Sequence, residues 1–168
     1  MKKILYIFIF LFLAVAGSAS AHQVRVVYLQ QGNVQISNPE VSQAFYDELK
    51  GKPRDYFITS PQGFDLNINL LVPEIANRDG RYSATIFSEN GGEQQIAELD
   101  GGSADWNEYY EPMGRDYYLQ GPSLENQLAA GKYKIEVFSK DNQGKYVLVV
   151  GQKEVYDVPS ILNAYWQL

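Results

Sequence analysis

The chain has 168 residues, 45% of them apolar, which is enough for one domain with a hydrophobic core. Its formal net charge of −6 argues against nucleic-acid binding, because neutralising phosphates needs an excess of Lys and Arg on one face. The absence of cysteine excludes disulfides, thiolate metal sites, cysteine nucleophiles and a lipidated N-terminal cysteine, and a single histidine excludes most metal and acid–base centres.

Residues 1–21 have the layout of a secretory signal peptide, which we expect to form a signal helix. Two lysines make a positive n-region, residues 4–16 are uninterruptedly apolar, and Ala19-Ser20-Ala21 is a small-x-small cleavage site. A spanning helix needs about 20 apolar residues, so we expect cleavage after Ala21 rather than retention as an anchor. The mature chain would begin at His22 and be exported to the periplasm, the cell surface or the medium.

The sequence predicts one short helix, at about 39–50. Asn38 is a suitable N-cap, and Gly51 is typical of a helix C-terminus. Between them, apolar side chains recur at the four-residue spacing of one helix face, at Val41, Phe45 and Leu49. We expect this helix to cover an open end or edge of the domain.

Alternation of apolar and polar residues predicts strands elsewhere in the chain, most clearly at 64–70 and 133–137. The run 145–151 is apolar on both faces, which predicts a central or covered strand, and the polar loop 139–144 predicts a hairpin between the last two runs. Weaker strand candidates are 24–29, 34–36, 56–59, 82–87, 94–99, 117–120 and 124–128. Gly121-Pro122 predicts a turn between the last two of them. Many short strands separated by Gly- and Pro-rich turns predict an all-β fold, a mostly antiparallel β-sandwich or jelly roll.

We assign residues 22–157 to this domain and residues 158–168 to a C-terminal tail. The tail favours a second short helix, because its apolar side chains share one face: Ile161, Leu162, Tyr165, Trp166 and Leu168. Eleven residues are too few to span a bilayer. Either the tail docks on the sandwich or the natural chain continues into an anchor, and we expect docking.

The second half of the chain resembles a known module. Residues 130–137, a polar turn and residues 144–150 resemble the closing hairpin of bacterial pre-peptidase C-terminal domains, and residues 56–58 followed by 66–73 resemble their earlier strands. The resemblance covers roughly residues 55–151 and implies a β-sandwich accessory module of a secreted protein. Members often accompany proteases, and some bind collagen, polysaccharide or calcium. These 168 residues include no segment that we expect to be a peptidase, the early acidic calcium-type motif is not clear in them, and the predicted helix is an addition.

Aromatic residues gather in one segment, interleaved with hydrogen-bonding side chains, at Trp106, Tyr109, Tyr110, Tyr117 and Tyr118. Flat aromatic faces bordered by polar groups are how sandwich modules bind sugar rings or peptides. The alternative is that these side chains line the core or cover strand edges. We expect any ligand surface to lie in this segment, with a polysaccharide or protein of the envelope as the ligand.

Two features raise the question of a metal. The acidic, glycine-rich loop offers calcium three carboxylates, Asp100, Asp105 and Glu108, although the spacing does not match an EF-hand and such loops are usually turns. His22 would become the mature N-terminus, a position used by some copper proteins, but a histidine brace needs a second imidazole and the chain has none. We predict no cofactor, with calcium in the loop as the open alternative.

Together these observations predict an exported, non-catalytic binding or structural module of the cell envelope or extracellular space, with an unidentified ligand. Catalysis has little support, because residues 101–105 miss the last glycine of a G-x-S-x-G elbow and the only imidazole is at the N-terminus. The alternative is a small secreted hydrolase or metal-dependent enzyme. We expect no nucleic-acid partner, and membrane contact only through the signal segment or a continued C-terminus.

Overall fold

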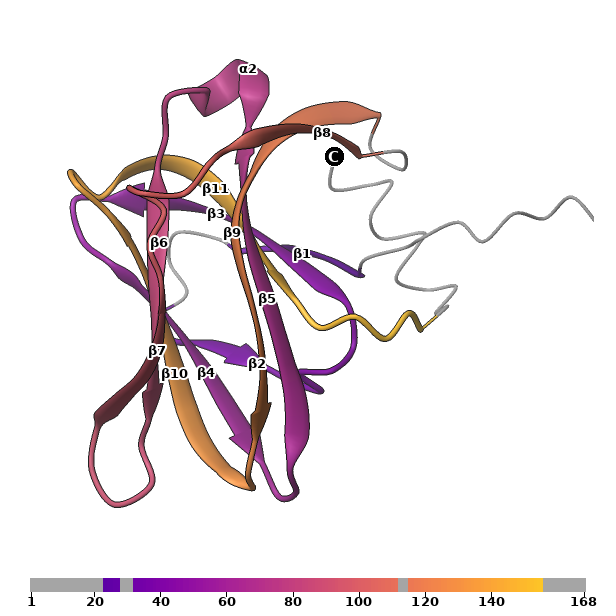
Figure 1. The fold of residues 1–168 in the computed structure, drawn as a ribbon, viewed down its shortest axis with the longest axis vertical. Helices are drawn as coiled ribbons and strands as arrows, with labels where there is room; N and C mark the ends of the chain where they lie inside the picture. Colours follow the sequence, from indigo (N-terminus) through magenta and orange to yellow (C-terminus); the bar gives the residue numbers. More distant parts are fainter. Residues whose placement is uncertain (1–22, 28–31, 112–114, 156–168) are drawn as a thin grey trace, which may run out of the picture.

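The computed structural model describes residues 23–27, 32–111 and 115–155. The signal segment, His22 and the tail from residue 158 therefore lie outside the described residues. The described part forms two packed sheets (Figure 1), which confirms the predicted β-sandwich. Within these ranges no helix is long and apolar enough to cross a membrane.

The larger sheet has six strands. Their order across the sheet is β1 (Gln23–Val26), β3 (Gln43–Lys50), β11 (Gln143–Val150), β5 (Phe64–Pro73), β9 (Asp116–Leu128) and β8 (Asn107–Glu111). All neighbours pair antiparallel except β1 and β3, which are parallel.

The smaller sheet has five strands. Their order is β2 (Val34–Ile36), β4 (Arg54–Ser60), β10 (Gly131–Ser139), β6 (Tyr82–Ser88) and β7 (Gln94–Leu99), with a parallel pair only between β2 and β4. The helix α2 (Glu74–Asn77) follows β5 and lies beyond the ends of the strands in Figure 1.

The main core lies between the two sheets, because alternate residues of each strand point inward. On β5 the inward residues Leu66, Ile68 and Leu70 are buried, whereas Asp65 is exposed. The predicted central strand is confirmed as β11, which lies between β3 and β5 and has buried residues on both faces.

The predicted helix at about 39–50 is wrong, because residues 43–50 form strand β3. A spacing of four residues fits one face of a helix, but it also fits one face of a strand, since four is a multiple of two. Phe45, Asp47 and Leu49 are all buried, and the carboxylate between two apolar residues concealed the two-residue period. Asn38 has a φ of +53° and belongs to a turn rather than a helix cap.

The predicted hairpin between the last two strands is also wrong, because β10 and β11 lie in different sheets. The loop between them carries the chain from one sheet to the other, with φ of +51° at Asn142 and +93° at Gly144. A positive φ serves a connection between sheets as well as a hairpin, so turn residues alone do not distinguish the two.

The candidates at 117–120 and 124–128 form a single long strand, β9. Gly121 and Pro122 lie inside this strand rather than in a turn. Opposite them the register with β5 shifts between Asn69 and Leu71. Such a bulge tolerates proline, because it frees one backbone position from the ladder of hydrogen bonds.

A buried ion pair joins β3 to β4. The Asp47 carboxylate accepts hydrogen bonds from Arg54 Nε at 2.7 Å and from the Tyr56 hydroxyl at 3.0 Å. The Tyr56 hydroxyl also lies 2.8 Å from that of Tyr146, and the Tyr146 ring packs on Tyr82 with centroids 5.0 Å apart. The network connects both sheets across the core.

These buried tyrosines make the fold sensitive to alkali. Burial raises the pKa of Tyr82 to about 12, and it also raises the pKa values of Tyr56 and Tyr146. A tyrosine in the unfolded chain ionises near pH 10. The stability that the folded chain gains by keeping these tyrosines protonated is therefore complete below about pH 10 and is lost as the pH rises towards about 12.

We therefore expect the free energy of unfolding, measured with urea, to fall between about pH 8 and about pH 11. In Tyr82→Phe, which has no phenol to titrate at this position, the fall should be smaller by about 1 kcal/mol. Equal falls in the two proteins would contradict the assignment of Tyr82 as an alkali-sensitive group.

Candidate functional site

The predicted aromatic residues occupy three different settings. Trp106 packs against the core, where its Nε1 donates to the Gly101 carbonyl oxygen at 2.9 Å and its ring lies against Gly121. Tyr109 pairs across β8 and β9 with Tyr118, which is buried. These three side chains therefore belong to packed clusters.

Tyr110 and Tyr117 form the exposed part of the aromatic segment. They pair across β8 and β9, with exposed fractions of 46% and 53%. Their ring centroids are 5.0 Å apart, and the ring planes are tilted by 51°. Strand alternation places this pair on the face of the hairpin opposite Tyr109 and Tyr118. Ligand binding by the segment stays a prediction.

The acidic loop is organised by its own hydrogen bonds. Asp100 Oδ1 accepts from the backbone N–H groups of Gly102 at 2.9 Å and Ser103 at 3.3 Å. Hydrogen bonds from the Ser103 side chain and from these backbone groups lower the pKa of Asp100. Glu108 Oε1 lies 3.6 Å from Arg78 Nη2.

The structure thus gives Asp100 and Glu108 separate partners, and Asp105 is an exposed residue of the same loop. No cluster of three or more His, Cys, Asp or Glu arranged to hold a metal occurs in residues 23–27, 32–111 and 115–155. Calcium binding by this loop stays a prediction, as does copper binding by His22, which lies outside those ranges.

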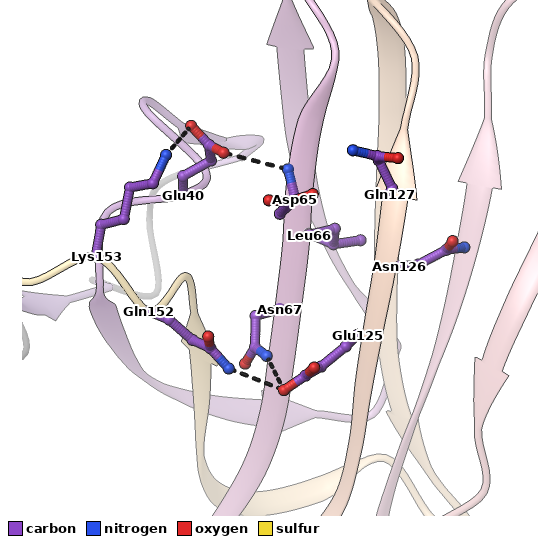
Figure 2. A pocket seen from close by; sticks show the side chains of 9 residues that line it. All are labelled: Glu40, Asp65, Leu66, Asn67, Glu125, Asn126, Gln127, Gln152 and Lys153. Carbon is purple, nitrogen blue, oxygen red and sulfur yellow. Dashed lines mark hydrogen bonds and ion pairs between the residues drawn. The ribbon is translucent and has the colours of Figure 1, made fainter.

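A polar groove that the sequence analysis missed lies against the six-stranded sheet (Figure 2). Its volume is about 340 Å³. It is formed by the loop before β3, by β5 and β9, and by the residues after β11, and we call it the amide groove. Its lining residues are Glu40, Asp65, Leu66, Asn67, Glu125, Asn126, Gln127, Gln152 and Lys153.

Strand pairing brings the polar side chains of this groove together. In the register of β5 and β9, Asp65 is opposite Gln127 and Asn67 is opposite Glu125. Asp65 and Asn67 flank the inward-facing Leu66, and their partners Gln127 and Glu125 lie on the same, outer face of the sheet. Asp and Asn are depleted in strands, and their repeated use at alternate positions of β5 is a sequence signal that could have identified the site.

Two carboxylates organise the groove. Glu125 Oε1 accepts from Asn67 Nδ2 and from Gln152 Nε2, both at 2.9 Å. Glu40 Oε2 accepts from Lys153 Nζ at 2.8 Å, while its Oε1 accepts from the Asp65 backbone N–H at 3.3 Å. The hydrogen bond from Lys153 is the main reason that the pKa of Glu40 lies below its usual value. Figure 2 shows each carboxylate hydrogen-bonded to one group of β5 and one group of the residues after β11.

The backbone fixes the two residues that follow β11. Gly151 has a φ of +80°, and a Cβ there would overlap the carbonyl oxygen of Val41. The next two N–H groups, of Gln152 and Lys153, donate to the Glu40 carbonyl oxygen at 3.1 and 2.8 Å. The glycine therefore lets the chain pass close to the loop before β3, which places Gln152 and Lys153 in the groove.

The groups that line the groove are suited to hydrogen bonding. Three carboxylates and one ammonium leave it with an acidic balance. Four carboxamides can each donate and accept hydrogen bonds.

The fold and the groove together define a β-sandwich module with a polar surface site. No protein-family model matches the chain, and no curated protein matches it. Solved structures resemble it in fold. One is the pre-peptidase C-terminal domain of collagenase from Bacillus anthracis, with a TM-score of 0.44 and 11% identity over 77% of this chain and 95% of that domain.

Two further solved structures are similar to the chain at lower scores. CorA, a surface-associated copper-binding protein from Methylomicrobium album BG8, has a TM-score of 0.36 and 8% identity over 76% of this chain and 98% of CorA. CBM35 from Cellvibrio japonicus Abf62 has a TM-score of 0.32 and 10% identity over 62% of this chain and 69% of that one. At these identities and scores the similarity concerns the fold alone.

Proposed function

We propose that the chain is an exported, non-catalytic binding module, and that the amide groove is its ligand surface for a neutral polysaccharide. The observation that carries the proposal is the outward row of carboxamides and carboxylates across β5 and β9, which the loop before β3 and the residues after β11 complete.

The composition of the groove supports a hydroxyl-rich ligand. Each sugar hydroxyl both donates and accepts hydrogen bonds, and the side chains of Asn67, Gln127 and Gln152 offer both kinds of group. The acidic balance repels anionic polymers such as nucleic acid. Glu125, Asn126 and Gln127 are exposed, so a ligand would displace water rather than break the packed core.

Binding can be tested by affinity electrophoresis of the mature chain in gels that contain a neutral or an anionic polysaccharide. We expect retardation by the neutral polymer, and Glu125→Ala should weaken it about tenfold, because the variant loses an acceptor and releases two ordered amides. Gln94→Ala, an exposed substitution on β7 of the other sheet, is the matched control and should bind normally.

Two results would replace this proposal. Loss of binding in Tyr110→Ala and Tyr117→Ala, with binding unchanged in Glu125→Ala, would move the ligand surface to the exposed aromatic pair. Release of reducing sugar that disappears in Glu125→Gln without loss of folding would favour the alternative, a small secreted hydrolase.

Export is part of the same proposal and has a separate test. The full chain, produced in a bacterial cell, is expected in the periplasmic or external fraction, with His22 as its first residue. Recovery in the membrane fraction with residues 1–21 still attached would show that the N-terminal segment acts as an anchor.

A further inference from the structure

A buried carboxamide occupies the first position of β3. Side chains on this strand alternate between two faces: Phe45 and Leu49 point into the main core, and Ala44 belongs to an apolar cluster on the opposite face. By the same alternation Gln43 points to the core side, and it is only 3% exposed. A carboxamide at such a position costs free energy unless its polar atoms are hydrogen-bonded, so its presence requires an explanation.

The hydrogen bonds of Gln43 provide that explanation. Its Nε2 donates to the carbonyl oxygens of Ser37 at 2.9 Å, Asn38 at 3.2 Å and Val41 at 3.2 Å. Within the same loop the Val41 N–H donates to the Asn38 carbonyl oxygen at 2.9 Å. One buried amide group therefore ties residues 37–41 into a compact loop at the end of the core.

This loop carries Glu40, which lines the amide groove. Four hydrogen bonds of the groove depend on the position of residue 40. Its carboxylate accepts from Lys153 Nζ and from the Asp65 backbone N–H, and its carbonyl oxygen accepts from the N–H groups of Gln152 and Lys153. Gln43 makes none of these contacts and does not line the groove, so it can act on the groove only through the loop.

We propose that Gln43 is a positioning residue of the amide groove. By holding residues 37–41 in one conformation, it places Glu40 so that Gln152 and Lys153 stay at the ligand surface. This inference rests on the proposed function of the groove. A ligand site that is ordered before binding loses less conformational entropy when the ligand arrives, so Gln43 should affect affinity without touching the ligand.

The test is Gln43→Met, which keeps an unbranched side chain of similar size at this core-facing position and removes the donor. Gln35→Met, the same change at an exposed position on β2, is the matched control. Amide hydrogen exchange of Gln152 and Lys153, whose N–H groups donate to Glu40, should become about tenfold faster in Gln43→Met and stay unchanged in the control. Retardation by a neutral polysaccharide should weaken about tenfold.

Two further measurements separate positioning from a general loss of stability. Amide exchange of Leu148, on the central strand β11, reports opening of the whole fold and should change by less than about twofold. The pKa of the Glu40 carboxyl, which the hydrogen bond from Lys153 lowers, should rise towards its ordinary value in Gln43→Met, as it should in Lys153→Met. A purely structural role of Gln43 would leave this pKa low in the folded chain.

Three results would overturn the proposal. Unchanged exchange of Gln152 and Lys153 in Gln43→Met means that the loop keeps its conformation without the amide. Equal acceleration at Leu148 means that Gln43 serves the whole fold rather than the groove. Faster exchange with unchanged binding means that the loop does not set the ligand surface.

The design also distinguishes failure of this inference from failure of the proposed function. If the neutral polysaccharide does not retard even the unmodified chain, the proposed function fails. The exchange rates and the pKa of Glu40 still decide whether Gln43 positions the loop, because neither measurement needs a ligand. If Gln43→Met does not fold, Gln43→Leu, with an apolar side chain of the kind found at Leu49, provides the same comparison.

Discussion

Replacing Asp47 by Ala is expected to lower the free energy of unfolding by about 3–5 kcal/mol. The substitution leaves the Arg54 guanidinium largely buried without the carboxylate that accepts its hydrogen bond. It also removes the acceptor of the Tyr56 hydroxyl, inside the network that reaches Tyr146. The cost is mainly that of removing the carboxylate that balances the buried charge of Arg54 and accepts from the buried Tyr56 hydroxyl. Urea denaturation at neutral pH measures it.

Two controls separate this effect from a general sensitivity of the fold. Asp79→Ala, in an exposed turn, should change the unfolding free energy by no more than about 0.5 kcal/mol. The double variant Asp47→Leu with Arg54→Met should recover much of the loss, because it removes both charges together. A loss below about 1 kcal/mol in Asp47→Ala would show that the ion pair is not the stabilising contact we infer.

Gly101→Ala is expected to be the most damaging substitution of a single small residue, with a loss of about 4 kcal/mol or failure to fold. A Cβ at this position would overlap the backbone carbonyl of Tyr82 on β6. Backbone cannot rotate away as a side chain can, so β6 or the loop would have to move. The Gly101 N–H donates to Ser83 Oγ at 3.0 Å, and its carbonyl accepts from Trp106, so both hydrogen bonds would be disturbed.

Gly32→Ala is the matched control, since a Cβ there meets no atom within 4 Å. It should leave stability within about 0.5 kcal/mol of the unmodified chain, or raise it slightly. Thermal unfolding followed by circular dichroism compares the two variants, and soluble yield provides the readout if Gly101→Ala does not accumulate. Equal stability of the two variants would show that the loop before Trp106 moves freely.

The strands were largely predictable from the sequence because strand periodicity is local. Residues 34–36 and 94–99 are strands with the predicted bounds, and the run that precedes Gly151 is the central strand that its apolar faces indicated. Errors arose where a local pattern fits two structures. The four-residue spacing around Phe45 suits a strand as well as a helix, and the glycine-containing loop before β11 suits a crossing between sheets as well as a hairpin.

The amide groove was harder to predict because no continuous segment contains it. Glu40, Asp65, Glu125 and Lys153 are distant in the sequence and become neighbours through the pairing of β5 with β9 and the close passage at Gly151. The aromatic segment was conspicuous for the opposite reason, since its residues are consecutive. Strand alternation then sends Tyr109 and Tyr110 to opposite faces, which sequence proximity conceals.

The position of β11 also constrains the order in which the fold can form. This strand comes last along the described chain, yet it lies between β3 and β5. Until residues 143–150 are available, the six-stranded sheet is divided into two parts, β1-β3 and β5-β9-β8. Contacts between residues so far apart in sequence form slowly, because ordering the long chain segment between them costs conformational entropy before the contact stabilises it. The six-stranded sheet therefore cannot be completed until residues 143–150 have been synthesised, so a chain made from its N-terminus stays without its central strand until almost all of it has appeared.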